Sequence, residues 1–399
     1  ASHSDANLGQ FHPALKKELS RLDGARGAQA YEALRGVWNT WDRADPTHVE
    51  EALAAAEQSG KLDAPVRAYA GLLGAYARMR RGDVAAARSK VDSLGFVRRW
   101  LVVGPFDNED RGGLGVEHGP EADFAQAIVP GRAYSGKERP VRWRVAPDAF
   151  PFGYVDFGSL LRPDRKVCAF ATTFVRAKAG SKAPRTISAW VGASGSFRLY
   201  WNGRAALEDP AYRGHDADRF ATQLTLAPGY NDLTVKVCSD DAPPAVSVRL
   251  ADAKGAPDTA LETSNDLAAS AEAAKLAPNK ADKKAPMKAA PARGPLGPVQ
   301  AFAAVVGGKA PRASDLEAWA RYLAATSGDD QNKHEARDAA RRAAELEPTV
   351  DRLLLAGELS EDRNQRRDWV DKAEALAKKR GKEDVDVLLA RADLARTGL

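Results

Sequence analysis

The residues that most resemble a reactive set lie between positions 200 and 218. Histidine and cysteine are scarce, with six and two in 399 residues, so few side chains could act as metal ligands or nucleophiles. An imidazole and three carboxylates are close in sequence here: Asp209, His215, Asp216 and Asp218. Carboxylates in a loop can bind calcium, which takes six or more oxygen ligands. The segment lacks the glycine-containing twelve-residue calcium loop. We therefore favour a solvated polar loop without metal or cofactor, and keep His215 and Asp216 as candidate ligand-binding residues.

Aromatic side chains of the same region could stack against a sugar ring. They are Trp190, Tyr200, Trp201, Tyr212 and Tyr230. Successive side chains of a strand point to opposite faces, so Trp201 is expected in the core and Tyr200 on the surface. Tyr200 and Tyr212 are therefore the candidate aromatic residues for a carbohydrate ligand. A sandwich that serves only as a spacer is the alternative.

Both cysteines, Cys168 and Cys238, lie in segments with strand-like alternation. A disulfide between them and two buried free thiols both remain open, because pairing needs Cα atoms within about 7 Å. A nucleophilic cysteine is disfavoured, since no histidine or acid accompanies either residue in a recognisable motif. No other catalytic constellation stands out, so we expect a protein that is not an enzyme.

Alternating apolar residues predict an antiparallel β-sandwich in the middle of the chain. Asn202-Gly203 predicts a type I′ hairpin turn, which needs positive φ at both central residues. Pro228-Gly229 predicts a second turn. The expected strands span residues 167–175, 185–191, 196–201, 220–226, 233–238 and 246–250.

Helical periodicity precedes and follows this region. Residues 65–95 predict a helical hairpin broken at Gly82-Asp83 and ending at Gly95. Near the C-terminus, apolar residues recur at an interval of 34, the period of tetratricopeptide repeats. The recurring positions are Trp319, Leu353 and Val387, with Leu354 and Leu388 one residue further on. Because the last unit lacks a polar cap, we expect the natural protein to continue beyond Leu399.

The fold class predicted by these patterns is multidomain α plus β, with helical-repeat hairpins flanking an antiparallel sandwich. We expect helical hairpins in residues 1–96 and the sandwich with a loop-rich entry in 97–252. Helical repeats return in 313–399. Between them, residues 253–312 are rich in Ala, Lys and Pro and predict a disordered linker.

Five segments of the central region follow a recognisable pattern. They are Ala169-Phe170-Ala171-Thr172-Thr173-Phe174, Val191-Gly192-Ala193-Ser194, Leu199-Tyr200-Trp201-Asn202-Gly203, Pro228-Gly229-Tyr230-Asn231 and Leu233-Thr234-Val235-Lys236-Val237. On these residues, the central segment resembles galactose-binding-like jelly rolls, the accessory modules of secreted bacterial hydrolases. The resemblance covers about residues 160–252 and implies a jelly-roll topology. Together with the helical hairpins and Gly104-Pro105-Phe106, the arrangement is similar to the N-terminal region of large bacterial repeat proteins that carry a transglutaminase-like domain.

The favoured functional hypothesis is a non-catalytic scaffold that binds a protein partner through its helical repeats. Two alternatives remain, an accessory region of a larger secreted transglutaminase-like or peptidase enzyme and a carbohydrate-binding module. The resemblance implies a secreted, periplasmic or cell-envelope location. A net charge of +5, from 59 basic and 54 acidic residues, does not indicate a nucleic-acid partner. No apolar run approaches the roughly 20 residues of a membrane span, so we expect no transmembrane segment.

Overall fold

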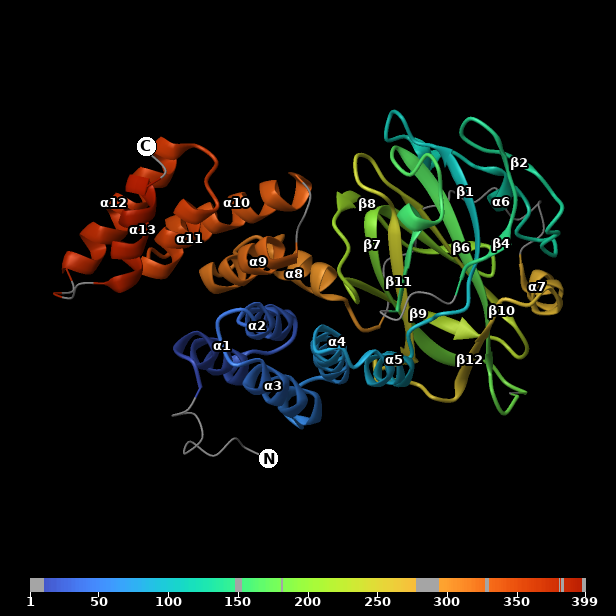
Figure 1. The fold of residues 1–399 in the computed structure, drawn as a ribbon, viewed down its shortest axis with the longest axis horizontal. Coiled ribbons are helices and arrows are strands. Elements are labelled where there is room, and N and C mark those ends of the chain that lie inside the picture. Colours follow the sequence, from blue (N-terminus) through green and yellow to red (C-terminus); the bar gives the residue numbers. More distant parts are fainter. Residues whose placement is uncertain are drawn as a thin grey trace.

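The computed structural model describes residues 11–147, 153–180, 182–277, 294–326, 330–379, 381 and 384–396. Most helices lie on one side of the molecule and a large curled antiparallel sheet forms the other (Figure 1). The two helical segments flank the sheet in the sequence but lie together in space. In particular, Gln29 of the N-terminal helices donates to Asp315 of the C-terminal helices at 2.9 Å.

The N-terminal helices begin where caps and prolines favour a first turn. Asp45 accepts a hydrogen bond from the Thr47 amide at 2.8 Å, and Asp83 accepts one from Ala86 at 3.1 Å. Gly82 has φ +86° between the last two helices, at the break expected from the sequence. These helices are α1 (Pro13–Gly24), α2 (Ala28–Asn39), α3 (Pro46–Gln58), α4 (Ala64–Arg80) and α5 (Val84–Ser93).

Among the described residues, ten strands form the curled sheet, in the order β4-β1-β6-β10-β7-β11-β5, with β12 on β6 and both β8 and β9 on β7. Neighbouring strands pair antiparallel throughout, and a small separate pair joins β2 to β3. The strands are β1 (Leu101–Asp107), β2 (Tyr134–Ser135), β3 (Pro140–Val141), β4 (Arg144–Val145), β5 (Tyr154–Asp156), β6 (Val167–Ala177), β7 (Arg185–Trp201), β8 (Arg204–Arg213), β9 (Phe220–Leu226), β10 (Asn231–Cys238), β11 (Ala245–Asp252) and β12 (Leu261–Ser264).

The long strand β7 belongs to both layers of this sheet. Its first half pairs with β9 and β11, and its second half pairs with β8 and β10. Two separate strands were expected here, but the chain continues through Gly195, which has φ +101°. A Cβ at Gly195 would lie 2.2 Å from the carbonyl oxygen of Cys238, so only glycine fits this bend.

A loop-rich segment covers the outer face of the second layer. It contains a short helix, α6 (Gly119–Ala122), and the 3₁₀ turn η2 (Gly113–Gly115). Another 3₁₀ turn, η3 (Phe157–Ser159), follows β5. We call residues 108–128 the cover segment, because several buried contacts hold it against β6, β7 and β10.

The prediction of a disordered linker over residues 253–312 is wrong where the structure describes them. Strand β12 pairs with β6, and α7 (Leu267–Ala273) continues into the 3₁₀ turn η4 (Ala274–Leu276). Helix α8 (Pro298–Val306) is attached to the edge of β9, because the Gln300 amide exchanges hydrogen bonds with the Ala221 backbone at 2.7 and 3.0 Å. The Ala-rich composition of this segment gave no indication of these contacts. The remainder of the expected linker, 278–293, lies outside the described residues.

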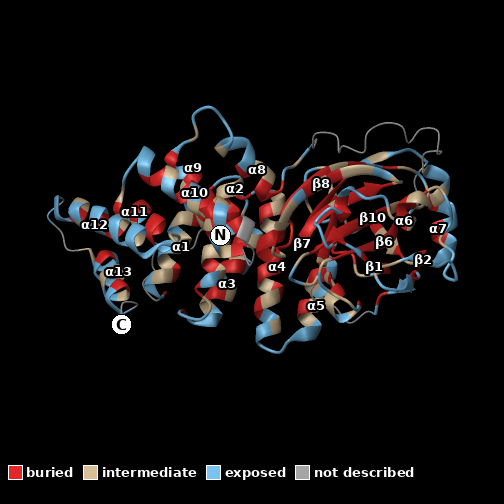
Figure 2. Ribbon diagram, turned by 90° about the horizontal axis from the view of Figure 1, so that it is seen from above, coloured by how far each residue is buried: buried red, intermediate tan, exposed pale blue. Residues whose placement is uncertain are grey.

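The C-terminal helices extend from the junction with the sheet to the far end of the molecule (Figure 1). Their amphipathic faces bury alanine, leucine and aromatic residues against one another (Figure 2). They are α9 (Ala313–Thr326), α10 (Asp330–Leu346), α11 (Val350–Glu358), α12 (Arg363–Lys379) and α13 (Val385–Arg396).

Cys168 of β6 and Cys238 of β10 lie directly opposite each other and form a disulfide. Of the two states left open by the sequence, the structure therefore has the bridged one. Both residues are fully buried, between the sheet and the cover segment. The bridge closes a loop of 70 residues that contains β7, β8 and β9.

Removal of this disulfide with Cys168→Ala and Cys238→Ala is expected to lower the free energy of unfolding by about 2–4 kcal/mol, because the unfolded chain regains the freedom of a long loop. Urea unfolding with and without reductant measures the effect. Reductant should destabilise the wild type to a similar extent and leave the double variant unchanged. Equal stability of the wild type and variant under oxidising conditions would contradict the prediction.

Candidate functional site

Tyr200 does not lie on an open surface, contrary to the prediction. The two side chains do point to opposite faces of the strand, as predicted, since Trp201 packs in the main core and Tyr200 points to the other face. However, the cover segment lies over that face. The Tyr200 hydroxyl donates to the Glu121 carboxylate, and the Phe124 ring lies 4.8 Å from the Tyr200 ring. Tyr200 is 1% exposed and is closed to a sugar ring.

A buried ion pair holds the cover segment on the sheet. Lys236 of β10 lies 3.0 Å from Glu121, and their side chains are 0% and 2% exposed. The Lys236 ammonium also donates to the Val116 carbonyl at 2.6 Å. Burial lowers the pKa of Lys236, and the adjacent Glu121 charge acts in the opposite direction. Since an isolated buried charge is costly, each partner requires the other.

A small cavity lies beside this pair, under the cover segment and α7. Its volume is about 20 Å³, enough for roughly one water molecule. Asp232 lines it, and both Thr172 and Thr234 donate to Asp232 Oδ1, at 2.9 and 2.7 Å. Burial raises the pKa of Asp232 to about 6, although the two hydroxyls oppose the shift. The arrangement can bind a proton or a water molecule, but it is much smaller than a sugar ring.

Tyr212 lies at the opposite edge of the cover segment and is half-buried. Its hydroxyl accepts a hydrogen bond from Asn108 at 3.0 Å, and the Arg111 guanidinium lies 5.1 Å from its ring centre. Asn108 itself is buried and donates to the Ser239 carbonyl at 2.8 Å. One edge of the Tyr212 ring therefore supports the start of the cover segment.

His215 lies in the connection between β8 and β9. Its Nε2 is 3.0 Å from the Ser247 hydroxyl, and its ring centre is 5.2 Å from that of Tyr154. Burial lowers the pKa of His215 to about 4, with the charge of Asp216 opposing the shift. The imidazole is therefore neutral at pH 7 and accepts or donates a hydrogen bond without carrying charge.

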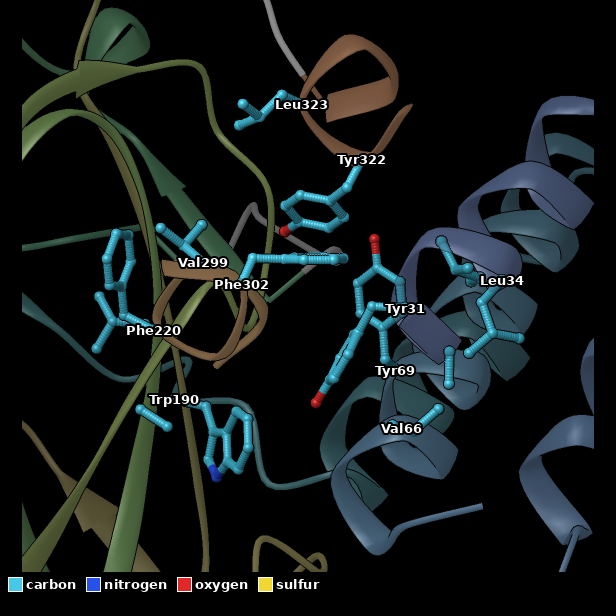
Figure 3. Close-up of a cluster of buried hydrophobic side chains, with 14 of the residues drawn as sticks. Tyr31, Leu34, Val66, Tyr69, Trp190, Phe220, Val299, Phe302, Tyr322 and Leu323 are labelled. Carbon is cyan, nitrogen blue, oxygen red and sulfur yellow. The ribbon is translucent and has the colours of Figure 1, made fainter. Parts of the chain in front are cut away.

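Asp216 is the centre of the contact between the helices and the sheet. Arg35 of α2 donates to Asp216 at 2.7 Å, and the Tyr69 and Tyr322 hydroxyls lie 3.2 Å from it. These donors come from α2, α4 and α9, while the acceptor follows β8. We call these four residues the Asp216 junction. Figure 3 shows Tyr69 and Tyr322 at this interface, with Phe302 and Trp190 close by.

The electrostatics of the junction favour one charge state. Burial would lower the pKa of Arg35, but the Asp216 carboxylate and the nearby tyrosines together outweigh burial and raise it. Burial raises the pKa of Tyr69 and Tyr322, so both hydroxyls remain protonated and can donate. Asp216, 5% exposed, thus receives three hydrogen-bond donors in place of water.

Two further ionic contacts extend this interface. Arg249 lies 2.7 Å from Asp218, both side chains being at most 1% exposed, and its guanidinium lies 5.0 Å from the Trp190 ring centre. On β8, Arg213 lies 2.8 Å from Asp209 and 3.3 Å from Glu335 of α10. The carboxylates at 209, 216 and 218 are therefore structural acceptors at the contact between sheet and helices.

The expectation of a solvated polar loop between residues 203 and 220 is wrong. Residues Arg204–Arg213 form β8, and the following acids are buried by their arginine partners. Among the described residues, the four candidate ligand-binding side chains have different neighbours. Tyr200 contacts Glu121, Tyr212 contacts Asn108, His215 contacts Ser247 and Asp216 contacts Arg35.

The structure also brings together residues that were not singled out from the sequence. Asp232, Thr234 and Lys236 alternate along β10, so the same face of the strand carries all three. This polar alternation within an apolar strand was the available signal for a covered polar face. Arg35, Glu121 and Arg249 carried no such signal, because their partners are distant in sequence.

The part of the chain that the structure describes contains neither a cluster of metal-ligating side chains nor a membrane-spanning helix. No group of three or more His, Cys, Asp or Glu side chains there is arranged to hold a metal ion. Within the same residues, no helix combines the length and apolar character needed to cross a membrane. The polar groups described above are instead engaged in contacts within the fold.

Replacement of the junction carboxylate with Asp216→Asn is expected to lower the free energy of unfolding by about 3–5 kcal/mol, because Arg35 is left buried without a counter-charge. Arg35→Met should lower the free energy of unfolding to a similar extent. The double variant should lose much less stability than the sum of the two single losses. A double-mutant cycle by urea unfolding measures this coupling. Asp338→Asn, which removes an exposed partner of Arg341, should cost less than about 1 kcal/mol. Additive costs in the cycle would contradict the proposed role of Asp216.

The Asp232→Asn variant is expected to change the pH dependence of stability. The folded pKa of about 6 exceeds the usual 3.8, so the folded state binds the proton more tightly than the unfolded state. Asp232 therefore contributes stability at pH below 4, and this contribution is lost as pH rises through 6, by up to about 3 kcal/mol. Unfolding at pH 4–8 should show the wild type losing stability relative to Asp232→Asn as pH rises. Parallel pH profiles for the two proteins would count against the assignment, and Asp338→Asn is the control.

Comparisons with known proteins give no relative on which to base an assignment. No family model matches the chain, and neither a curated protein nor a solved structure matches it significantly.

Proposed function

We propose that this protein is a non-catalytic scaffold that binds a protein partner through its helices. The observation that carries the proposal is the Asp216 junction. One carboxylate that follows β8 binds donors from α2, α4 and α9, so the sheet and both helical segments have a common buried anchor. Such an anchor fixes the orientation of the helices, which a binding surface built from several segments requires.

Tetratricopeptide-type packing of the C-terminal helices is part of this proposal. Trp319, Leu353 and Val387, at intervals of 34 residues, are all buried, with exposed fractions of 6%, 4% and 3%. Equivalent burial at a fixed interval supports repeated helical units. Stacked units of this kind present extended surfaces suited to peptides or partner helices.

For the sheet, we propose the role of a galactose-binding-like jelly-roll accessory module. Two antiparallel layers that share β7, and positive φ at both Asn202 and Gly203, are in keeping with that topology. The covered outer face favours a structural role over carbohydrate binding. The buried disulfide supports a secreted, periplasmic or cell-envelope location, because disulfides persist in oxidising compartments.

The proposal predicts that the full chain, immobilised as bait, retains a protein partner from native envelope extract. Cross-links identified by mass spectrometry should connect that partner to α9–α13. A folded bait with Asp216→Asn should retain less partner, because the helices are no longer held in one orientation. The proposal would be overturned if the bait retained no more protein than a resin without bait. Cross-links confined to the sheet would also overturn it.

A glycan array on the same protein tests the carbohydrate alternative. The structure leaves Tyr212 as the more accessible of the two candidate aromatic residues. Glycan binding that Tyr212→Ala abolishes would replace the scaffold proposal with the carbohydrate-binding one. We expect no glycan on the array to bind the protein.

A further inference from the structure

Helix α13 has apolar residues on two sides. Val387 and Leu394 are buried against the preceding helices. On the outer side, Val385, Leu388 and Leu389 are 68%, 53% and 63% exposed. Ala392 and Ala395, which are also exposed, continue the outer stripe at helical spacing. Large apolar side chains on the outer face of a helix indicate a surface that another element covers.

Helix α11 has leucines at the positions equivalent to Leu388 and Leu389, and there they are less exposed. Leu354 and Leu355 precede Leu388 and Leu389 by 34 residues. Leu355 is 5% exposed and Leu354 packs against the core. Helix α11 is closely packed against α12, where a Cβ on Gly357 would lie 3.4 Å from Trp369 Cβ. Of the two leucines of α11, the first is partly buried and the second is buried, whereas both of the equivalent leucines of α13 are exposed.

The charges of α13 favour one kind of cover. Asp386 lies in its first turn and Arg396 in its last, and their side chains are 58% and 82% exposed. In an antiparallel pair of α13 helices, the apolar stripes face each other and Asp386 of each copy lies opposite Arg396 of the other. A parallel pair would instead place like charges together. Antiparallel helix dipoles also attract.

We propose that α13 is a self-association surface, at which two copies of this chain pair through their α13 helices in an antiparallel, two-fold arrangement. Val385, Leu388 and Leu389 form the apolar contact, and two Asp386–Arg396 pairs flank it. A helix of 12 residues is about 18 Å long. Such a contact is smaller than the roughly 1,600 Å² of a standard interface. The dimer is therefore weak.

Sedimentation equilibrium of the purified chain, over a wide range of protein concentrations, tests the proposal. The average mass should rise from monomer towards dimer. Leu388→Glu with Leu389→Glu should weaken association at least about tenfold, because carboxylates would be buried against each other. Val305→Glu is the matched control, since Val305 is 44% exposed on α8 and should not affect association. A monomer at every concentration, or a dimer insensitive to the leucine changes, would overturn the proposal.

Charge exchange then tests the arrangement. Asp386→Arg should weaken association, because each new arginine faces Arg396 of the other copy. Adding Arg396→Asp should restore association to within about threefold of the wild type, since the opposite charges face each other again. Circular dichroism must show that both variants fold, because Asp386 lies 3.8 Å from Lys17 of α1 and Arg396 lies 3.0 Å from Asp393. Failure of the second change to restore association would exclude the antiparallel pairing.

Discussion

Burial of the Asp216 carboxylate is the constraint on which the arrangement of sheet and helices depends. A carboxylate removed from water needs donors on several sides, and here Arg35, Tyr69 and Tyr322 supply them. No single helix could do so, because the donors approach from three directions. Displacement of any one of these helices would leave the charge partly unsolvated. The polar contact therefore fixes how the helices are oriented on the sheet. Apolar packing alone would specify that orientation less uniquely.

A second buried charge closes the other side of the sheet. Lys236 and Glu121 hold the cover segment over the face that carries Tyr200, much as Asp216 holds the helices over the inner layer. The side chains that looked reactive in the sequence thus serve as acceptors and donors within the fold. Asp232 accepts hydrogen bonds from two neutral hydroxyls. Burial raises its pKa to about 6, although these two hydroxyls act in the opposite direction.

Local patterns predicted much of the sheet but little of the candidate site. Alternation placed Trp201 and Tyr200 on opposite faces, and Asn202-Gly203 marked a real turn, because both depend on neighbouring residues. Whether Tyr200 is exposed depends on Glu121, 79 residues earlier. Asp216 looked solvated because its partner Arg35 is 181 residues away. No local pattern encodes such partners. The same limit explains the error at α8, whose attachment to the sheet uses one glutamine side chain.

The wide sequence spacing of the junction has a consequence for synthesis on the ribosome. Arg35 is made 181 residues before Asp216, and Tyr322 follows 106 residues after it. At about 5–20 residues per second, the N-terminal helices wait roughly 10–40 s for their acceptor. During this interval α2 and α4 expose the apolar faces that later meet the sheet. The junction can therefore close only late in translation, after Tyr322 has been made.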